Sequence, residues 1–474
     1  MNIINKIKQN ELKYLIPSFA IFSLFTWLVN IPQTINIIVY LLILLTLIIF
    51  KFNNITILIF TLFSLLGNRT PYIMDREFSK VHFLYPAIFI ASSLYFIIYL
   101  IINKKKNIYK LLLPMTLFIV YSFISLIWSL DPVEGLSKIT LIIQGYFIYF
   151  VITNTKEHIS FNYLSWFLSL FLFVLSVEFF TLAYQYTNST NIIQNLKQMI
   201  NINKNAYLTL WANPNLAAAI FGIGFVPSLY KYFNKQNSKY TYLYIILDLF
   251  VIFGMILTQS RGLYFGLLIG LIVAPIILLI KNAGVKYTIF NGMILATLVF
   301  IIAILVLQNK YNNLYIDINK ISSGRFTLYN FAYKEILNKP ILFIFGQGTG
   351  SVRGLLRPLG HGEFYLHSFI INLLYTTGII GTIFIFLIHF NTYKILKING
   401  SLFAKLTAIA IFIYVGHELI DIGYDYQFLG VLLYFIIAVI EKDNERKAYN
   451  EKNIISTNNN SINNNISIMW FIKY

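Results

Sequence analysis

Apolar stretches of about 20 residues follow one another along most of the chain, separated by brief polar interruptions. A stretch of this length crosses a bilayer as an α-helix, whereas the helices of a soluble domain carry a charged face. The pattern therefore predicts an all-α, polytopic integral membrane protein with about 12–14 transmembrane helices. The candidate spans, with ends accurate to about four residues, are 13–30, 32–50, 54–67, 83–102, 111–130, 138–153, 163–183, 213–230, 241–259, 262–280, 288–307, 366–389, 403–420 and 427–440. The third and the last are short, and a re-entrant segment there would lower the count.

The distribution of lysine and arginine orients these spans. Basic residues favour cytoplasmic loops. Lysines collect in alternate connections, at the N-terminus and near 51, 104–110, 156, 231–239, 281–286 and 394–405. We therefore expect that side, with both chain ends, to be cytoplasmic. The opposite, extracytoplasmic side receives 68–82, 131–137, 184–212, the turn at Arg261, 308–365 and 421–426.

Composition agrees with this class and excludes others. Hydrophobic residues make up 58% of the 474 positions and charged residues only 11%. The net charge of +18 is spread over short loops rather than one soluble face, so we expect no nucleic-acid partner. The absence of cysteine excludes disulfides, thiolate nucleophiles and cysteine metal sites. No cleavable signal peptide is evident, because the first apolar span is followed directly by a second.

Two units are predicted. Residues 1–440 form a transmembrane helical bundle that includes a long extracytoplasmic loop, 308–365, with short helices. Residues 441–474 form a cytoplasmic, low-complexity tail containing STNNNSINNNIS, which cannot bury enough apolar surface to order itself. Within the bundle, WANPNLAAAI predicts a helix start at the outer surface, with small residues for close helix packing.

The long loop contains several candidate binding residues. Its SGRFTLYNFAYKEILNK segment has the spacing of an amphipathic helix, with Phe326, Tyr329, Tyr333, Ile336 and Leu337 on the apolar face. Arg325 then lies in the first turn, where free backbone N–H groups favour an anion such as phosphate, although pairing with a nearby carboxylate is an alternative. The following FGQGTGSVRG segment provides four glycines for tight turns and close ligand approach, but lacks a nucleotide-binding ending.

Arg261 and His367 stand at predicted membrane boundaries. Arg261 lies between two apolar spans in TQSRGLYFGLLIG. A permanently charged side chain is costly close to the bilayer core, so we expect Arg261 to have a function there. His367, where the long loop meets the next span, titrates near neutral pH and can accept a proton from a hydroxyl, unless it is only an interfacial histidine. Possible secondary contacts to a substrate are Arg353, Arg357 and His361, with solvated loop roles as the alternative. For Glu178 and Asp248, inside predicted spans, we expect hydrogen-bonded structural roles, with transport as the alternative.

The ordered set IWSLDP, WANPNLAA, TQSRGLYFGLLIG, SGRFTLYNFAYKEILNKPILFIFGQGTG and LHSFIINLLYTTGIIG resembles the bacterial O-antigen ligase and O-antigen polymerase family. The resemblance covers roughly 120–390. It implies transfer of a glycan from a polyprenyl diphosphate carrier, with two arginines holding the diphosphate and a histidine acting on the acceptor. Arg261, Arg325 and His367 match those positions. Ser368 stands where the family often has asparagine, which puts a side-chain role at that position in doubt.

These residues suffice for the implied chemistry. A polyprenyl diphosphate is already a good leaving group, so the protein must neutralise charge, align a hydroxyl and remove one proton. We therefore predict a metal- and nucleotide-independent glycosyltransferase of the bacterial cytoplasmic membrane, with no cofactor and a periplasmic active site. The expected partners are an undecaprenyl-diphosphate-linked glycan donor, a lipid A-core or carrier-linked glycan acceptor, and the lipid bilayer. An O-antigen ligase is the first hypothesis, a repeat-unit polymerase the second, and a glycolipid flippase or transporter a third that would show internal repeats.

Overall fold

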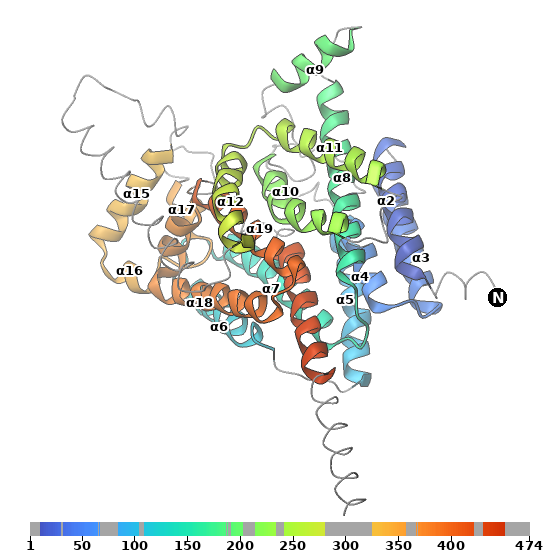
Figure 1. The fold of residues 1–474 in the computed structure, drawn as a ribbon. Helices are drawn as coiled ribbons and strands as arrows, with labels where there is room; N and C mark the ends of the chain where they lie inside the picture. Colours follow the sequence, from blue (N-terminus) through green and yellow to red (C-terminus); the bar gives the residue numbers. More distant parts are fainter. Residues whose placement is uncertain are drawn as a thin grey trace, which may run out of the picture.

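The fold is a bundle of α-helices, and the part of the chain that the structure describes contains no strand (Figure 1). This computed structural model describes residues 10–29, 32–64, 66, 84–103, 109–185, 187, 191–201, 214–233, 241–279, 325–356, 366, 368–420 and 430–450. The helices are α2 (Glu11–Val29), α3 (Gln33–Ile49), α4 (Asn54–Phe63), α5 (Leu84–Asn103), α6 (Leu112–Ser125), α7 (Pro132–Asn154), α8 (Phe161–Gln185), α9 (Ile192–Asn201), α10 (Pro214–Ser228), α11 (Thr241–Leu257), α12 (Arg261–Leu279), α15 (Arg325–Asn338), α16 (Ile341–Phe345), α17 (Ser351–Leu356), α18 (Phe369–Asn399) and α19 (Leu402–Ile420). Two 3-10 turns, η2 (Leu126–Trp128) and η4 (Leu229–Phe233), extend α6 and α10, and residues 430–450 form a further helix.

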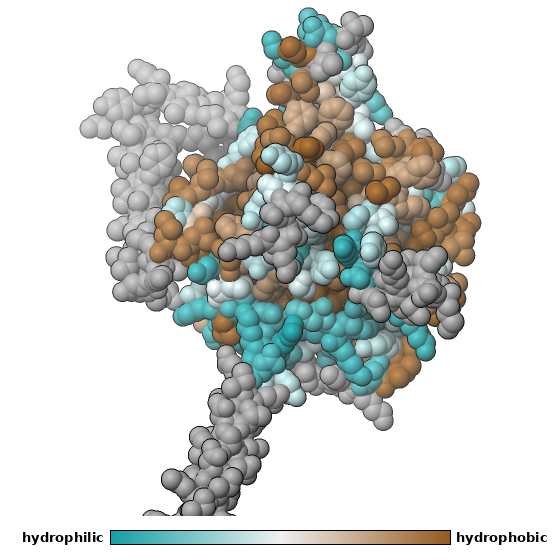
Figure 2. Space-filling view, turned by 45° about the vertical axis from the view of Figure 1, so that its right-hand side comes forward, coloured by the Kyte–Doolittle hydropathy of each residue, from teal (hydrophilic) through white to brown (hydrophobic). Residues whose placement is uncertain are grey.

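The prediction of an all-α, multi-pass membrane protein is confirmed. Seven of the described helices are long and apolar enough to cross a bilayer, and several others are shorter but apolar. Each predicted span coincides with a described helix, except 288–307, which lies outside the described residues. Hydrophobic residues cover much of the visible surface, and hydrophilic residues gather at its lower end (Figure 2). Large apolar side chains such as Leu271 and Ile102 are exposed, as expected where lipid rather than water surrounds the protein.

The short third span is an internal helix. All ten residues of α4 are buried, and α2, α3 and α5 pack around it. A helix of this length is about 15 Å long, half of a hydrocarbon core. It starts where the side chain of Asn53 accepts a hydrogen bond from Ile55 N at 2.9 Å. The described helix therefore fills the interior of the bundle rather than facing lipid.

The centre of the bundle is α8, which packs against α2, α10 and α11. On one side, aromatic rings of α4 and α8 interlock, with the Phe63 and Phe167 centroids 5.5 Å apart. On the other, α10 packs against α8, and its Ala217, Ala218 and Ala219 are completely buried. The prediction that WANPNLAAAI begins a closely packed helix is confirmed from Pro214 onward. Small side chains take up little space between helices, so the two helix backbones can lie close together.

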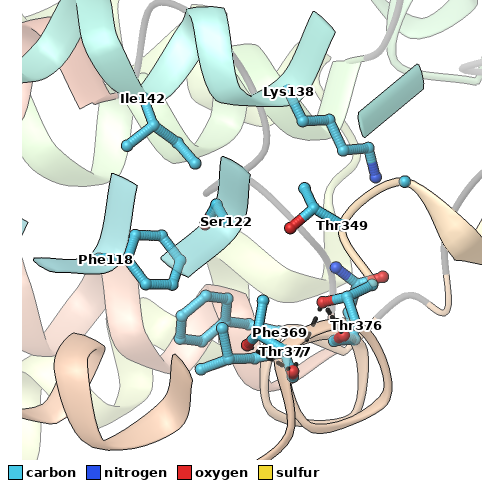
Figure 3. A pocket seen from close by; sticks show the side chains of 11 residues that line it. Phe118, Ser122, Lys138, Ile142, Thr349, Phe369, Thr376 and Thr377 are labelled. Atoms are coloured by element: carbon cyan, nitrogen blue, oxygen red, sulfur yellow. Dashed lines mark hydrogen bonds between the residues drawn. The ribbon is translucent and has the colours of Figure 1, made fainter. Parts of the chain in front are cut away.

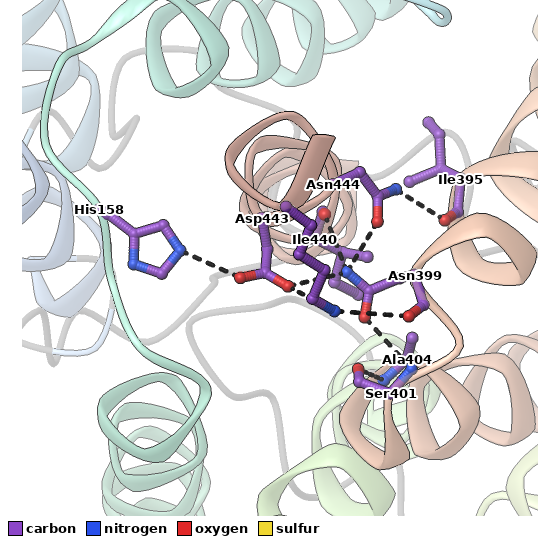
Figure 4. A network of polar contacts seen from close by, with 9 residues as sticks. His158, Ile395, Asn399, Ser401, Ala404, Ile440, Asp443 and Asn444 are labelled. Atoms are coloured by element: carbon purple, nitrogen blue, oxygen red, sulfur yellow. Dashed lines mark hydrogen bonds and ion pairs between the residues drawn. The ribbon is translucent and has the colours of Figure 1, made fainter. Parts of the chain in front are cut away.

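Polar contacts close one end of the bundle (Figure 4). Asn399, at the end of α18, donates hydrogen bonds to Asp443 at 3.0 Å and Asn444 at 2.8 Å. Asp443 also lies 3.4 Å from His158 Nε2, in the α7–α8 connection, and 3.0 Å from Lys447 Nζ. We call this the network end. Burial raises the pKa of Asp443, but hydrogen bonds from His158, Lys447 and Asn399 outweigh it and hold that pKa below its usual range.

The helix at 430–450 continues ten residues beyond the predicted end of the bundle. Its polar segment joins the network end, where Tyr109 donates a hydrogen bond to Glu445 at 2.9 Å and Lys442 donates to the backbone of Thr155. These contacts explain the difference, because a polar segment orders when its side chains find partners on neighbouring helices. Residues 451–474, with the Asn-rich tract, lie outside the described residues.

The two acidic residues in predicted spans have different settings. Asp248 accepts hydrogen bonds from Lys231 at 2.6 Å and from Tyr232 at 2.6 Å, and Lys231 also donates to Ser169 at 2.7 Å. A buried pair of opposite charge with this many hydrogen bonds is a structural contact. The hydrogen-bonded role predicted for Asp248 is therefore present. Glu178 is fully buried in α8, and its structural role stays a prediction.

Candidate functional site

Arg261 is the first residue of α12 and its side chain is exposed. The turn before it is built by the predicted TQSRG segment. Ser260 accepts a hydrogen bond from Leu263 N at 3.3 Å, as a helix-capping side chain does. Gln259 adopts φ +48°, which is uncommon for a residue with a side chain and makes the reversal between α11 and α12 sharp.

The start of α12 rests on the end of α19. A Cβ atom added at Gly262 would lie 2.9 Å from Cδ2 of His417, and one at Gly416 would lie 2.8 Å from the Cα of Gly266. His417 is completely buried, with Nδ1 3.2 Å from Glu418 Oε1. The sequence offered only Glu418 and Asp421 as neighbours of this histidine. The glycines at every fourth position of RGLYFGLLIG were the available signal, because that spacing favours close helix contact.

Arg325 is the first residue of α15, as predicted, although its side chain lies outside the described part. The buried face of α15 differs from the predicted one. Leu328 and Ala332 are buried, whereas the exposed fraction of Tyr333 is 60%. Leu328 and Ala332 belong to a small apolar cluster with residues of α17 and α18. Contacts with these helices, rather than the position of the aromatic residues, therefore determine which face of α15 is buried.

His367 lies outside the described residues, but its neighbours do not. Leu366 and Ser368 are both buried, and Ser368 occupies the N-cap position of α18. Leu366 belongs to the same apolar cluster as Leu328, which lies one turn after Arg325. The structure therefore holds the start of α15 and the residue before His367 in one cluster.

Helix directions place these starts at the same end of the bundle. Helix α18 ends at Asn399 in the network end and is broken at Gly378, where φ is +61° and ψ −164°. Figure 1 shows α12 and α15 on the side of the bundle away from the helix at 430–450. Helix α19 begins beside Phe161, whose ring stacks on that of Phe403 with the centroids 4.7 Å apart. Phe161 follows His158 of the network end by three residues, so α19 begins near that end. It runs from there toward Gly262, which its His417 contacts. We call this opposite end the loop end. The backbones of Arg261 and Arg325 both lie there, together with Leu366 and Ser368.

The glycine-rich segment docks onto the IWSLDP motif. Gly346, Gly348 and Gly350 have φ of +72°, +97° and +91°, as predicted for left-handed turns. Gln347 N and Gly348 N donate to backbone carbonyls of α18 at 2.7 and 2.9 Å, and Ser129 Oγ donates to Thr349 O at 2.7 Å. A Cβ at Gly350 would collide with the backbone of Asp131 and Gly135. These glycines therefore permit backbone contact within the protein, rather than the approach of a ligand.

Among the secondary candidates, Arg353 is described and is ion-paired. Its Nη1 lies 3.7 Å from Glu134 Oε2, in the first turn of α7. Asp131 caps that turn by accepting a hydrogen bond from Glu134 N at 3.0 Å. Arg353 therefore fastens α17 to α7. Arg357 and His361 lie outside the described residues.

A small cavity with a mixed polar and apolar lining lies beside the glycine-rich segment (Figure 3). The volume open to the centre of a water molecule is about 20 Å³. Lys138 of α7 is buried and its side chain extends toward Thr349. Asn372, Thr376 and Thr377 of α18 contribute polar groups to the lining. Lys138 was not singled out in the sequence. Its position at the outer edge of a predicted span was the available signal.

Comparison with known proteins supports the resemblance seen in the motifs. Residues 246–386 match the family model described as O-antigen ligase. This segment contains Arg261, Arg325, Arg353, Arg357, His361 and His367. A comparison with curated proteins gave no match. The motifs, the helical membrane fold and the matched segment agree, and residues 246–386 are similar to the O-antigen ligase family.

Proposed function

We propose that the protein transfers an oligo- or polysaccharide from an undecaprenyl-diphosphate carrier to an acceptor hydroxyl at the outer face of the cytoplasmic membrane, as an O-antigen ligase with lipid A-core as acceptor. The family match supports glycosyltransferase-like activity of ligase or polymerase type on a lipid-linked glycan. The donor, the acceptor and the side of the membrane are parts of the proposal.

The observation that carries this proposal is the position of two arginines. Arg261 and Arg325 are each the first residue of a helix, at the same end of the bundle. A helix N-terminus carries partial positive charge, so a cation there costs roughly 0.3–1 kcal/mol, whereas an anion is favoured. A helix start is therefore an unfavourable place for a cation and a favourable one for an anion. A bound diphosphate removes the penalty, because each N-terminus and each guanidinium then acts on a negative ligand.

The proposed reaction needs few groups. The acceptor oxygen attacks the anomeric carbon of the glycan, the bond to the diphosphate oxygen breaks on the opposite face, and configuration inverts. His367 accepts the proton of the acceptor hydroxyl. Arg261 and Arg325 neutralise the leaving diphosphate through bidentate hydrogen bonds. Since the leaving group is already activated, no step calls on a nucleotide or a metal.

The first test replaces His367 with alanine in a strain that lacks the chromosomal copy. Loss of glycan on the surface lipid, with normal protein level and insertion, is expected because the general base contributes about 10²–10⁴-fold to the rate. Arg446→Ala is the matched control, since this exposed arginine lies near the network end. Wild-type surface glycan in the His367→Ala strain would contradict the mechanism.

The second test distinguishes ligase from polymerase. Purified protein receives a synthetic polyprenyl-diphosphate glycan with either lipid A-core or a second carrier-linked glycan. Product on lipid A-core supports the ligase. Elongated glycan on the carrier alone would instead identify a polymerase. In cells, ligase loss leaves long glycan on the carrier, whereas polymerase loss leaves single repeats on the lipid core.

A further inference from the structure

Helix α9 is an amphipathic helix next to the loop end of α8 (Figure 1). Asn191 caps it, with its side chain accepting a hydrogen bond from Ile193 N at 2.9 Å. Met199 and Asn195 are buried where α9 packs against α8 and α11. One face of the helix is therefore covered by the bundle, and its other described side chains are exposed. The family resemblance and the proposed reaction leave it without a role.

The rest of α9 divides into two sectors of different polarity. At about 100° per residue, Lys197 lies opposite the buried face. On one flank lie Ile193, Leu196 and Ile200, with exposed fractions of 66%, 37% and 44%. The other flank carries Gln194 and Gln198, both exposed. An apolar strip confined to one flank, with a cation beside it, is the arrangement of a helix that lies along a membrane surface.

The position of α9 selects a bilayer as the occupant of this strip. The 25 residues of α8 extend about 37 Å, slightly more than a hydrocarbon core, so its end lies at the lipid headgroups. Tyr184 near that end is exposed, and exposed tyrosines are enriched at membrane interfaces. The apolar strip begins nine residues later, at Ile193. Lys197 complements anionic headgroups.

A hydrogen bond connects α9 to the candidate site. Gln259 lies two residues before Arg261, and its Nε2 donates a hydrogen bond to the carbonyl of Ile200 at 2.8 Å. The same Gln259 carries the positive φ of the turn. The end of α9 therefore touches the turn that presents Arg261, and a change in the depth of α9 displaces that turn.

We propose that α9 is an interfacial helix. Its apolar strip of Ile193, Leu196 and Ile200 inserts among the lipids of the leaflet at the loop end, and this contact fixes the Arg261 turn at the depth of the lipid headgroups. This rests on the proposed function in one respect, because headgroup height is where a carrier diphosphate lies. The membrane contact itself is independent of the reaction.

The contact is tested by depth measurement, which the cysteine-free chain makes direct. Single-cysteine variants Ile193→Cys and Leu196→Cys carry an environment-sensitive fluorophore, in full-length protein reconstituted in phosphatidylcholine–phosphatidylglycerol vesicles with spin-labelled lipids. Gln194→Cys and Gln198→Cys are matched controls on the other flank. We expect blue-shifted emission and lipid quenching at 193 and 196 only. Equal quenching on both flanks, or protection at 193 and 196 that appears only with increasing protein density, would overturn the proposal, the latter in favour of self-association.

The link to the site is tested by activity. The double variant Ile193→Asp/Leu196→Asp is expected to lower transfer from a membrane-embedded carrier by roughly ten- to hundred-fold, because displacement by about 1 Å costs up to 10²-fold. Transfer from a short-chain donor in detergent should stay unchanged, as should both activities in Gln194→Asp/Gln198→Asp. Equal loss in both assays would overturn the positioning role. Absence of transfer in the wild-type protein would instead refute the proposed function while leaving the depth result intact.

Discussion

The two ends of the bundle use charge differently. At the network end, carboxylates meet cations and amides of other helices, as Asp443 does with His158, Lys447 and Asn399. At the loop end, Arg353 pairs with Glu134 between α17 and α7, but Arg261 and Arg325 begin their helices. Lys397, by contrast, lies in the last turn of α18, where the helix dipole favours a cation.

This difference separates stability from function. Charges placed with the dipole or paired across helices lower the energy of the folded chain. Charges placed against the dipole raise it, and a bound anion would offset that cost. The network end therefore holds the bundle together, and the loop end is the part expected to bind an anion. The following changes test this contrast.

Asp248→Asn is expected to have the largest effect. It leaves the Lys231 ammonium buried without its counter-charge, which costs about 3–5 kcal/mol of stability. Thermal unfolding in detergent measures the loss, while the activity of each surviving molecule stays unchanged. Lys231→Met/Asp248→Leu is the matched control and should recover most of the stability, since an apolar pair replaces the ionic one. A fully stable single variant would show that this pair does not hold the bundle.

Arg261→Ala is expected to do the opposite. Loss of a charge that stabilises the leaving group lowers transfer by about 10²–10³-fold, or roughly 3–4 kcal/mol. Because the side chain is exposed, the loss of stability should stay below about 1 kcal/mol. Arg261→Lys should also be poor, because an ammonium cannot form the bidentate fork. Transfer assays on purified protein measure both. Full activity with lysine would reduce the role of Arg261 to simple charge balance.

Gly350→Ala tests how the loop end is held. The substitution strains φ +91° and drives a methyl group into the backbone of α7, at a cost of about 2–5 kcal/mol. Gly400→Ala shares the positive φ but meets only Lys397 O at 3.8 Å, so about 1–2 kcal/mol is expected. Unfolding of both variants separates collision from strain. Equal losses would mean that the glycine-rich segment is not closely docked.

Asp443→Asn should have the smallest effect, about 1 kcal/mol near neutral pH. Since the folded pKa of Asp443 is lowered from 3.8, its contribution to stability is present above pH 3.8 and is lost as pH falls toward the folded pKa. The stability difference between wild type and Asp443→Asn should therefore shrink below about pH 4 and stay constant above it. Unfolding across this range measures it. A constant difference down to pH 3 would contradict the lowered pKa.

Much of the fold was predictable because membrane-spanning helices are recognised in a sequence by the length and hydrophobicity of their apolar stretches. The starts of α12 and α15 at their arginines followed from the SRG and SGR turns. The buried face of α15 did not, because Leu328 and Ala332 are chosen by contacts with α17 and α18. The helix at 430–450 exceeded its predicted end for the same reason, since its polar residues find partners on distant helices. His367, Arg357 and His361 remain predictions.

The sequence by itself determined that this is a helical membrane protein, which of its residues are permanent cations, and where α12 and α15 begin, since these depend on local hydrophobicity and turn chemistry. Only the tertiary structure decided three contacts. The glycine-rich segment is hydrogen-bonded to the IWSLDP motif, Arg353 forms an ion pair with Glu134, and Gln259 in the Arg261 turn is hydrogen-bonded to α9. Such contacts join residues far apart in the chain, and their geometry exists only once the helices have packed.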